Sequence, residues 1–270
     1  MSARLRNNVT ITGTGSTTLV FAHGFGCDQT VWRFMAPAFE DRYRVVTFDL
    51  TGSGGSDLSA YDRARHGSLH GFAEDLIDII GELKGPVVYV GHSVSAMIGI
   101  LAAIKAPDHF LAQVMIAPSP CYIDDDSGGY RGGFSRGDID ELLETMDANY
   151  LGWSSTMAPV IMGAPNLPHL GIELTNNFCR NDPDIARHFG RVTFLADHRA
   201  DLPRARVPAL ILQCSDDLIA PREVGAYLQR RLAGSQLREV VNVGHCPHMS
   251  APEECVRLTR DFLDTLGLQA

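Results

Sequence analysis

The sequence lacks a long apolar run and a paired cysteine motif. None of its 270 residues belongs to an apolar stretch of about 18 residues, the length a membrane-spanning helix requires. Residues 1–10 are polar and mixed, unlike the apolar core of a secretory signal. The six cysteines include no C-x-x-C pair and are too sparse for a disulfide scaffold. We therefore expect no membrane contact, reduced thiols and a cytoplasmic location.

An excess of basic residues is also lacking. Lys and Arg total 23 against 32 Asp and Glu, which gives a formal net charge of −9. Nucleic-acid-binding faces cluster Lys and Arg, so no nucleic-acid partner is expected. Hydrophobic residues make up 45% of the chain and charged residues 20%, which excludes disorder and fits a globular protein with a large core.

Short apolar runs alternate with helical patterns along most of the chain. The apolar runs predict six buried strands, at residues 19–22, 43–50, 87–90, 113–117, 209–214 and 237–243. The helical patterns between them lie at residues 69–83, 94–106, 221–232 and 252–266. Strands that alternate with helices predict an α/β fold, with a mostly parallel sheet flanked by helices.

One segment interrupts this alternation. Residues 124–133 are rich in Asp and Gly and predict a loop. Four helical patterns follow, at residues 139–153, 156–162, 169–178 and 183–196. We therefore predict a helical cap over residues 119–202, inserted into a core made of residues 1–118 and 203–270.

The residues Gly91-His92-Ser93-Val94-Ser95 follow a predicted strand and open a predicted helix. This is the context of a nucleophile elbow, a sharp turn that requires small residues two positions before and after the nucleophile. Gly91 meets this requirement, and Ser95 is still among the smallest side chains. Ser93 is the predicted nucleophile; the alternative is that it only caps the helix.

A serine hydroxyl becomes a good nucleophile only when a base takes its proton. Asp216 and Asp217 follow the fifth predicted strand and His245 follows the sixth, in the order Ser, Asp, His. The carboxyl ends of parallel strands meet at one edge of a sheet, so these groups are expected to converge there. His245 is the predicted base, with His248 as its competitor, and one of the two aspartates would orient it.

Two backbone N–H groups are needed to stabilise the oxyanion. The predicted donors are the N–H groups of Val94, which follows the nucleophile, and of Phe25. Phe25 lies in the glycine-rich segment His23–Gly26, which could otherwise be an ordinary turn.

Two other motifs do not indicate a ligand site. Residues 49–56 fail the spacing of phosphate-binding loops and predict a structural turn. Residues 245–248 form a tight His/Cys cluster without partners at zinc spacing, so no metal is expected.

Together these motifs resemble the α/β-hydrolase superfamily. Over nearly the full length, the chain resembles the RsbQ-like bacterial stress-pathway regulators and the related plant karrikin and strigolactone receptors. The stretches that carry the resemblance are residues 23–32, 91–101, 119–122, 132–134, 149–153 and 244–249. In this family the catalytic acid is followed by three variable residues and a proline or a nearby equivalent. The segment Asp217-Leu-Ile-Ala-Pro221 matches, which favours Asp217 over Asp216.

The resemblance implies a four-helix cap and a mostly apolar pocket above the serine. The positions that match the family's pocket are Phe25, Phe134, Trp153, Met157, Phe194 and Ile219. Aromatic residues at helical spacing also fit an ordinary core. The family's substrates are small hydrophobic esters or butenolide lactones, and it needs no cofactor.

Two functions follow from the resemblance. The first is a serine hydrolase of a small ester or lactone that works through an acyl-enzyme, with a bacterial signalling role. The second is a regulatory module that binds a hydrophobic ligand with little turnover and signals to a sensor or phosphatase partner.

The residues do not all resemble the same branch of the family. Residues 49–54 resemble the bacterial branch, whereas Ser95 resembles the plant receptors. A hydrolase of carbon–carbon bonds or a cofactor-free perhydrolase would use the same triad. An aspartate nucleophile is disfavoured because serine occupies the elbow.

Overall fold

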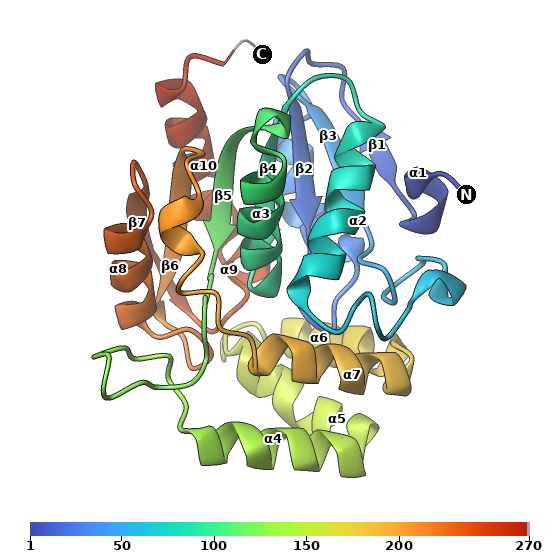
Figure 1. Ribbon diagram of the computed structural model, residues 1–270, viewed down its shortest axis with the longest axis vertical. Coiled ribbons are helices and arrows are strands. Elements are labelled where there is room, and N and C mark those ends of the chain that lie inside the picture. Colours follow the sequence, from blue (N-terminus) through green and yellow to red (C-terminus); the bar gives the residue numbers. More distant parts are fainter. Residues whose placement is uncertain (269–270) are drawn as a thin grey trace.

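The computed structural model describes residues 1–268 and arranges seven strands in one sheet (Figure 1). The strands are β1 (Thr10–Thr12), β2 (Thr18–Ala22), β3 (Arg44–Phe48), β4 (Val87–His92), β5 (Phe110–Ile116), β6 (Ala209–Asp216) and β7 (Gln236–Val243). Their order in the sheet is β1-β3-β2-β4-β5-β6-β7. Only β1 pairs antiparallel among the described strands, and every other pairing is parallel. The parallel strands therefore end at a common edge.

The six predicted strands are all present, and the sequence missed only β1. This strand is three residues long, and all three are exposed at the edge of the sheet. Because it is short and buries no face, it leaves no apolar run in the sequence. The strands β2 and β4 are buried throughout, as expected of central strands covered by helices on both faces.

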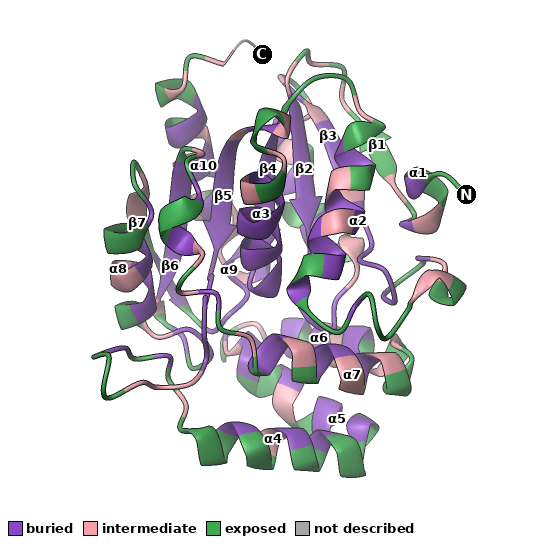
Figure 2. Ribbon diagram, in the orientation of Figure 1, coloured by how far each residue is buried: buried purple, intermediate pink, exposed green. Residues whose placement is uncertain are grey.

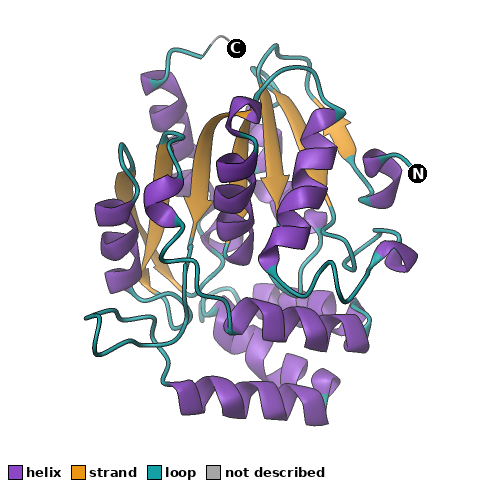
Figure 3. Cartoon of the chain, in the orientation of Figure 1, coloured by secondary structure: helices purple, strands orange, loops and turns teal. Residues whose placement is uncertain are grey.

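Helices cover both faces of the sheet and lie in front of it and behind it in the view of Figure 1 and Figure 3. One face carries α2 (Leu69–Gly81), α3 (Val94–Lys105) and α8 (Arg222–Arg231), and the other carries α10 (Pro252–Thr265). The short helices α1 (Ala3–Arg6) and α9 (Pro247–Ser250) lie near the first strands and after β7, respectively. The burial pattern is strongest in the sheet and in α3, where ten of twelve residues are buried (Figure 2). The core therefore lies between the sheet and its helices.

Four further helices lie between β5 and β6, beyond the carboxyl ends of the parallel strands (Figure 3). They are α4 (Arg136–Ala148), α5 (Tyr150–Met162), α6 (Pro168–Arg180) and α7 (Pro183–Phe194), and we call them the cap helices. The structure has the predicted number of helices here, but one predicted boundary is wrong. The sequence prediction ended the first helix at residue 153, whereas the break falls at Asn149.

Asn149 explains this boundary. Its side-chain Oδ1 accepts a hydrogen bond from Gly152 N at 2.9 Å, so it caps the first turn of α5. Residues 154–155, which the prediction left between two helices, lie inside α5. The hydroxyls of Ser154 and Ser155, like that of the following Thr156, donate to carbonyls four residues earlier. These side chains stay inside the helix, and α5 continues through them.

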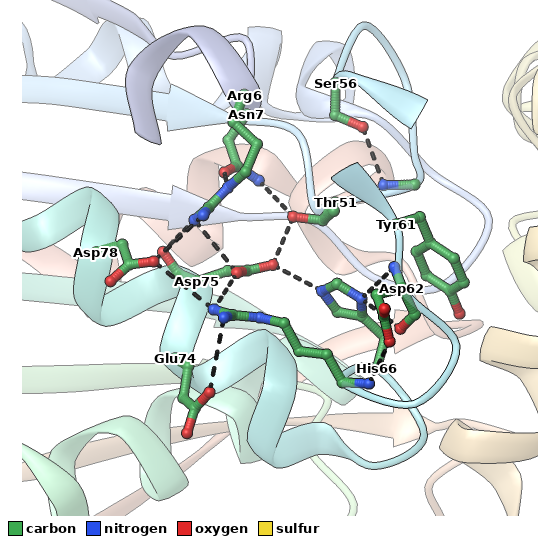
Figure 4. Close-up of polar contacts among 12 residues, drawn as sticks. Arg6, Asn7, Thr51, Ser56, Tyr61, Asp62, His66, Glu74, Asp75 and Asp78 are labelled. Atoms are coloured by element: carbon green, nitrogen blue, oxygen red, sulfur yellow. Dashed lines mark hydrogen bonds and ion pairs between the residues drawn. The ribbon is translucent and has the colours of Figure 1, made fainter. Parts of the chain in front are cut away.

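A buried carboxylate, Asp75 on α2, fixes the loop after β3 (Figure 4). Thr51 Oγ1 donates to it at 2.6 Å, His66 Nε2 lies at 2.9 Å, and Arg6 and Arg65 form ion pairs at 3.2 and 2.7 Å. Burial raises the pKa of Asp75, but the hydrogen bonds from His66 and Thr51 and the nearby Arg6 lower it more. The network connects α1, the loop and α2, which supports the prediction of a structural turn at residues 49–56.

Candidate active site

The turn between β4 and α3 holds Ser93 in a strained backbone conformation. Its φ is 55° and its ψ is −123°, a region that side-chain-bearing residues rarely adopt. A Cβ at Gly91 would lie 2.7 Å from the carbonyl oxygen of Ser95, so the turn is too tight for any residue other than glycine there. This is the geometry of a nucleophile elbow, with Ser93 at its apex.

Three side chains from separate elements meet at the carboxyl edge of the sheet. His245, two residues after β7, places Nε2 2.8 Å from Ser93 Oγ and Nδ1 2.8 Å from Asp217 Oδ2. Asp217 directly follows β6, and all three residues are buried. With Nδ1–H donated to the carboxylate, the Nε2 lone pair faces the serine hydroxyl. This arrangement can move a proton from Ser93 to His245.

Asp217 is held as a carboxylate by its surroundings. Its Oδ1 accepts hydrogen bonds from the backbone N–H groups of Ile219 and Ala220, at 2.8 and 3.1 Å. Burial raises the pKa of Asp217, but His245 and these backbone donors outweigh it, so the net pKa is lowered. Asp216 is exposed at the end of β6. The structure therefore directs Asp217, and not its neighbour, toward His245.

His248 lies behind the site. Its ring is fully buried and packs against Trp32 at 4.7 Å and His92 at 4.3 Å between ring centroids. Within residues 1–268, neither of its ring nitrogens has a hydrogen-bond partner. His92 Nε2 donates to the backbone carbonyl of His245 at 2.8 Å, which fixes the loop that carries the base. Of the two histidines considered as the base, the structure brings His245 to Ser93.

The imidazoles packed behind the site stay neutral. Burial lowers the pKa of His92 to about 3, with a further contribution from His245. Burial also lowers the pKa of His248 well below its ordinary value, helped by His92 and His245. A charged imidazole in this apolar packing would be costly because burial removes its hydration.

Replacing His248 with leucine is expected to flatten the pH dependence of stability. With the pKa of folded His248 far below 6.5, the unfolded chain binds one more proton than the folded chain in the window below about pH 6.5. The free energy of unfolding therefore rises with pH in this window, by about 1.4 kcal/mol per pH unit for one imidazole. Urea denaturation of wild type and His248→Leu between about pH 5 and 6 measures the difference in slope.

The control for this measurement is His70→Leu, at an exposed histidine. This variant keeps His248, so it shows whether a change of slope belongs to His248 or follows from the loss of any imidazole. If His248→Leu kept the wild-type slope, His248 would titrate alike in the folded and unfolded chains, and the proposed burial effect would be wrong.

The segment His23–Gly26 approaches the serine closely. A Cβ at Gly24 would lie 2.6 Å from His92 Nδ1 and 3.3 Å from Ser93 Cβ, so only glycine allows this approach. Ser95 Oγ donates to the carbonyl of His23 at 2.5 Å and ties this segment to the elbow. The segment also carries Phe25, which lines the same cavity as Ser93. The backbone N–H groups of Phe25 and Val94 would both donate hydrogen bonds to the oxyanion.

A narrow cavity lies above Ser93, under the cap helices. Its volume is about 400 Å³. The lining residues are Phe25, Cys27, His92, Ser93, Tyr122, Ile161, Leu174, Phe178, Thr193, Phe194, Ile219, His245 and Cys246. Most of these side chains are apolar, so the cavity suits a small hydrophobic group.

The predicted pocket residues fall into two groups. Phe25, Phe194 and Ile219 line the cavity, whereas the lining formed by residues 1–268 does not include Phe134, Trp153 or Met157. The Trp153 ring stacks on Phe178 with 5.9 Å between centroids, so it packs one layer behind the wall. Phe134 and Met157 are partly buried against the core.

Besides the predicted Ser93 and His245, the cavity lining contains polar residues that sequence reasoning missed. Tyr122 OH lies 3.4 Å from Ser93 Oγ, and burial raises its pKa to about 12, so the phenol stays protonated. Thr193 near the end of α7 also lines the cavity. Tyr122 stands in one of the stretches that carried the family resemblance, which was the available signal; Thr193 had none.

Nothing in the described part of the chain is arranged to hold a metal ion. Residues 1–268 contain no group of three or more His, Cys, Asp or Glu side chains with metal-binding geometry. The cluster at residues 245–248 is divided between two roles, since His245 faces Ser93 and His248 packs in the core.

Residues 19–258 match the alpha/beta hydrolase family. The chain therefore belongs to this family, and the predicted fold and enzyme class, a hydrolase, are confirmed. Among its relatives is the karrikin insensitive 2 receptor CA of Petunia hybrida, which is 41% identical over 250 residues, 92% of each chain. Strigolactone esterase D14 of Arabidopsis thaliana is 37% identical over 258 residues, 95% of this chain and 96% of the relative. The predicted resemblance to the plant receptors is thus confirmed.

A solved structure of another hydrolase is also similar to this chain. A hydrolase from Oleispira antarctica has a TM-score of 0.94 and 41% sequence identity, over 97% of this chain and 96% of that chain. Across residues 1–268, no helix has both the length and the apolar character needed to cross a bilayer.

Proposed function

We propose that this hydrolase cleaves a small hydrophobic ester or lactone through an acyl-enzyme. The observation that carries the proposal is the continuous hydrogen-bonded chain from Ser93 Oγ through His245 to Asp217. A serine in a strained elbow, a histidine at hydrogen-bond distance and a buried carboxylate on its far nitrogen are the parts that acyl transfer requires.

The reaction would proceed in two halves. Ser93 Oγ attacks the carbonyl carbon while its proton moves to His245 Nε2, and the oxyanion accepts hydrogen bonds from the N–H groups of Phe25 and Val94. Asp217 stabilises the imidazolium, which then gives its proton to the departing alkoxide. In the second half, His245 takes a proton from water as the water attacks the acyl group. The proton returns to Ser93 Oγ when the carboxylic acid leaves.

The substrate class follows from the cavity and from the relatives. The lining is largely apolar and the open space is small, which favours a compact hydrophobic substrate. One relative, at 37% identity, is named a strigolactone esterase. These two observations support an ester or a lactone over a peptide or a large polar substrate.

A regulatory role is the second candidate function. It is favoured by a relative at 41% identity that is named a receptor. In this role the protein would bind its ligand, turn it over slowly in the cytoplasm and signal to a sensor or phosphatase protein, as in the bacterial stress-regulator branch. In this role we predict that the cap, residues 119–202, would present the signal to the partner.

A serine-reactive fluorophosphonate tests the proposed chemistry. The probe is expected to phosphonylate Ser93 Oγ with loss of fluoride, and tryptic mass spectrometry should place the single adduct on Ser93. The matched variant His245→Gln should label far more slowly, because the serine then lacks its base. An adduct on another residue, or equal labelling rates in the two proteins, would refute the assignment.

A further inference from the structure

Thr193, near the end of α7, has a hydroxyl whose bonding is unexplained. The residue is 2% exposed and lines the same cavity as Ser93. Its Oγ1 is buried and has no hydrogen-bond partner within residues 1–268. Buried hydroxyls are normally paired, because an unpaired one has lost its hydrogen bonds to water without replacement.

Its position in a helix does not account for the missing partner. Serine and threonine inside helices commonly donate to the carbonyl four residues earlier. Five residues of the cap helices do so at 2.8–3.1 Å: Thr145, Ser154, Ser155, Thr156 and Thr175. Thr193 differs from these five in leaving its hydroxyl without this bond, on the side of α7 that lines the cavity.

The other side-chain oxygens of the cavity lining already have partners, and one ring nitrogen, His92 Nδ1, has none within residues 1–268. Ser93 and His245 bond to each other, and Tyr122 OH lies near Ser93 Oγ. His92 Nε2 donates to the His245 carbonyl, and its unpaired Nδ1 faces the backbone of Gly24, where an added Cβ would lie 2.6 Å away. The hydroxyl of Thr193 is therefore the side-chain oxygen of this lining that is free, within residues 1–268, to bind a ligand.

We propose that Thr193 is a specificity-determining residue whose hydroxyl donates a hydrogen bond to an oxygen atom of the substrate outside the scissile ester group. The inference rests on the proposed function and narrows it. The substrate is a small ester or lactone that is mostly apolar, to match Phe25, Phe178 and Phe194, and carries one additional acceptor oxygen. A site that pairs a buried hydroxyl with its substrate discriminates against an analogue that lacks the oxygen, because the hydroxyl then stays unpaired.

Two matched substrate pairs test this proposal. The acyl pair is p-nitrophenyl methoxyacetate and p-nitrophenyl butyrate, and the alcohol pair is 2-methoxyethyl acetate and butyl acetate. Within each pair an ether oxygen replaces a methylene at nearly constant shape. The ratio of kcat/KM for the ether over the alkyl substrate is measured in wild type, Thr193→Val and Thr193→Ser, so that intrinsic ester reactivity cancels between proteins.

Thr193→Val removes the hydroxyl at constant shape and is expected to lower the ratio about fivefold in at least one pair. Thr193→Ser keeps the hydroxyl and should retain the wild-type ratio. If wild type hydrolyses the esters but Thr193→Val leaves both ratios unchanged, this inference is overturned and the proposed function stands. If wild type hydrolyses none of the four esters, the proposed function fails and the inference fails with it.

Discussion

Replacing Ser93 with alanine is expected to lower kcat/KM for p-nitrophenyl acetate by about 10⁴-fold or more. The variant keeps the fold and the cavity but has no oxygen to form the acyl-enzyme. His245 would then have no partner at the elbow, where its Nε2 lies 2.8 Å from Ser93 Oγ in the wild type. Initial rates of p-nitrophenol release, corrected for spontaneous hydrolysis, measure the effect.

Ser95→Ala is the matched control for this prediction. Ser95 is buried in the same turn and donates to the His23 carbonyl, so its loss removes one hydrogen bond but no reacting atom. We expect it to retain turnover within about tenfold of the wild type. Equal rates for Ser93→Ala and wild type would contradict the assignment of the nucleophile.

The second large effect is expected for Asp217→Asn, which should lower kcat/KM by about 10³-fold or more. The amide is nearly the same shape as the carboxylate, so the fold should persist. It is uncharged, however, and cannot stabilise the imidazolium that forms when His245 takes the serine proton. It can also hold the imidazole in the wrong tautomer by donating to Nδ1.

Asp216→Asn separates this effect from a general loss of charge near the site. Asp216 adjoins Asp217 in sequence but is exposed at the end of β6, so its substitution should change kcat/KM by less than about twofold. The same p-nitrophenyl acetate assay serves both variants, with melting temperatures to confirm folding. A larger loss for Asp216→Asn than for Asp217→Asn would exchange the roles assigned to the two residues.

Most of the fold could be predicted because its signals are local. The strands β2 and β4 are buried on both faces, so each appears in the sequence as an unbroken apolar run. The edge strand β1 has three exposed residues and left no such signal. The break at Asn149 was missed because its capping bond to Gly152 depends on side-chain geometry that a hydrophobic pattern does not record.

The cavity was harder to predict than the elbow. Whether an aromatic side chain faces the ligand or the layer behind it depends on the packing of several helices. Trp153 stacks on Phe178 behind the wall, while Phe194 on α7 reaches the lining. Sequence spacing gives both residues the same helical signal. Thr193 was missed for a related reason, since only the surrounding structure reveals that its hydroxyl lacks a partner.

The sequence by itself determined how strands and helices alternate along the chain, the sharp turn at Ser93 and the set of residues at the strand ends. These features depend on neighbours within a few positions along the chain. The family resemblance favoured Asp217 over Asp216, and the structure places Asp217 Oδ2 2.8 Å from His245 Nδ1. Only the tertiary structure decided which side chains enclose the cavity. Successive residues of an extended chain point to opposite sides, so Asp216 and Asp217 are adjacent in sequence yet face solvent and His245, respectively.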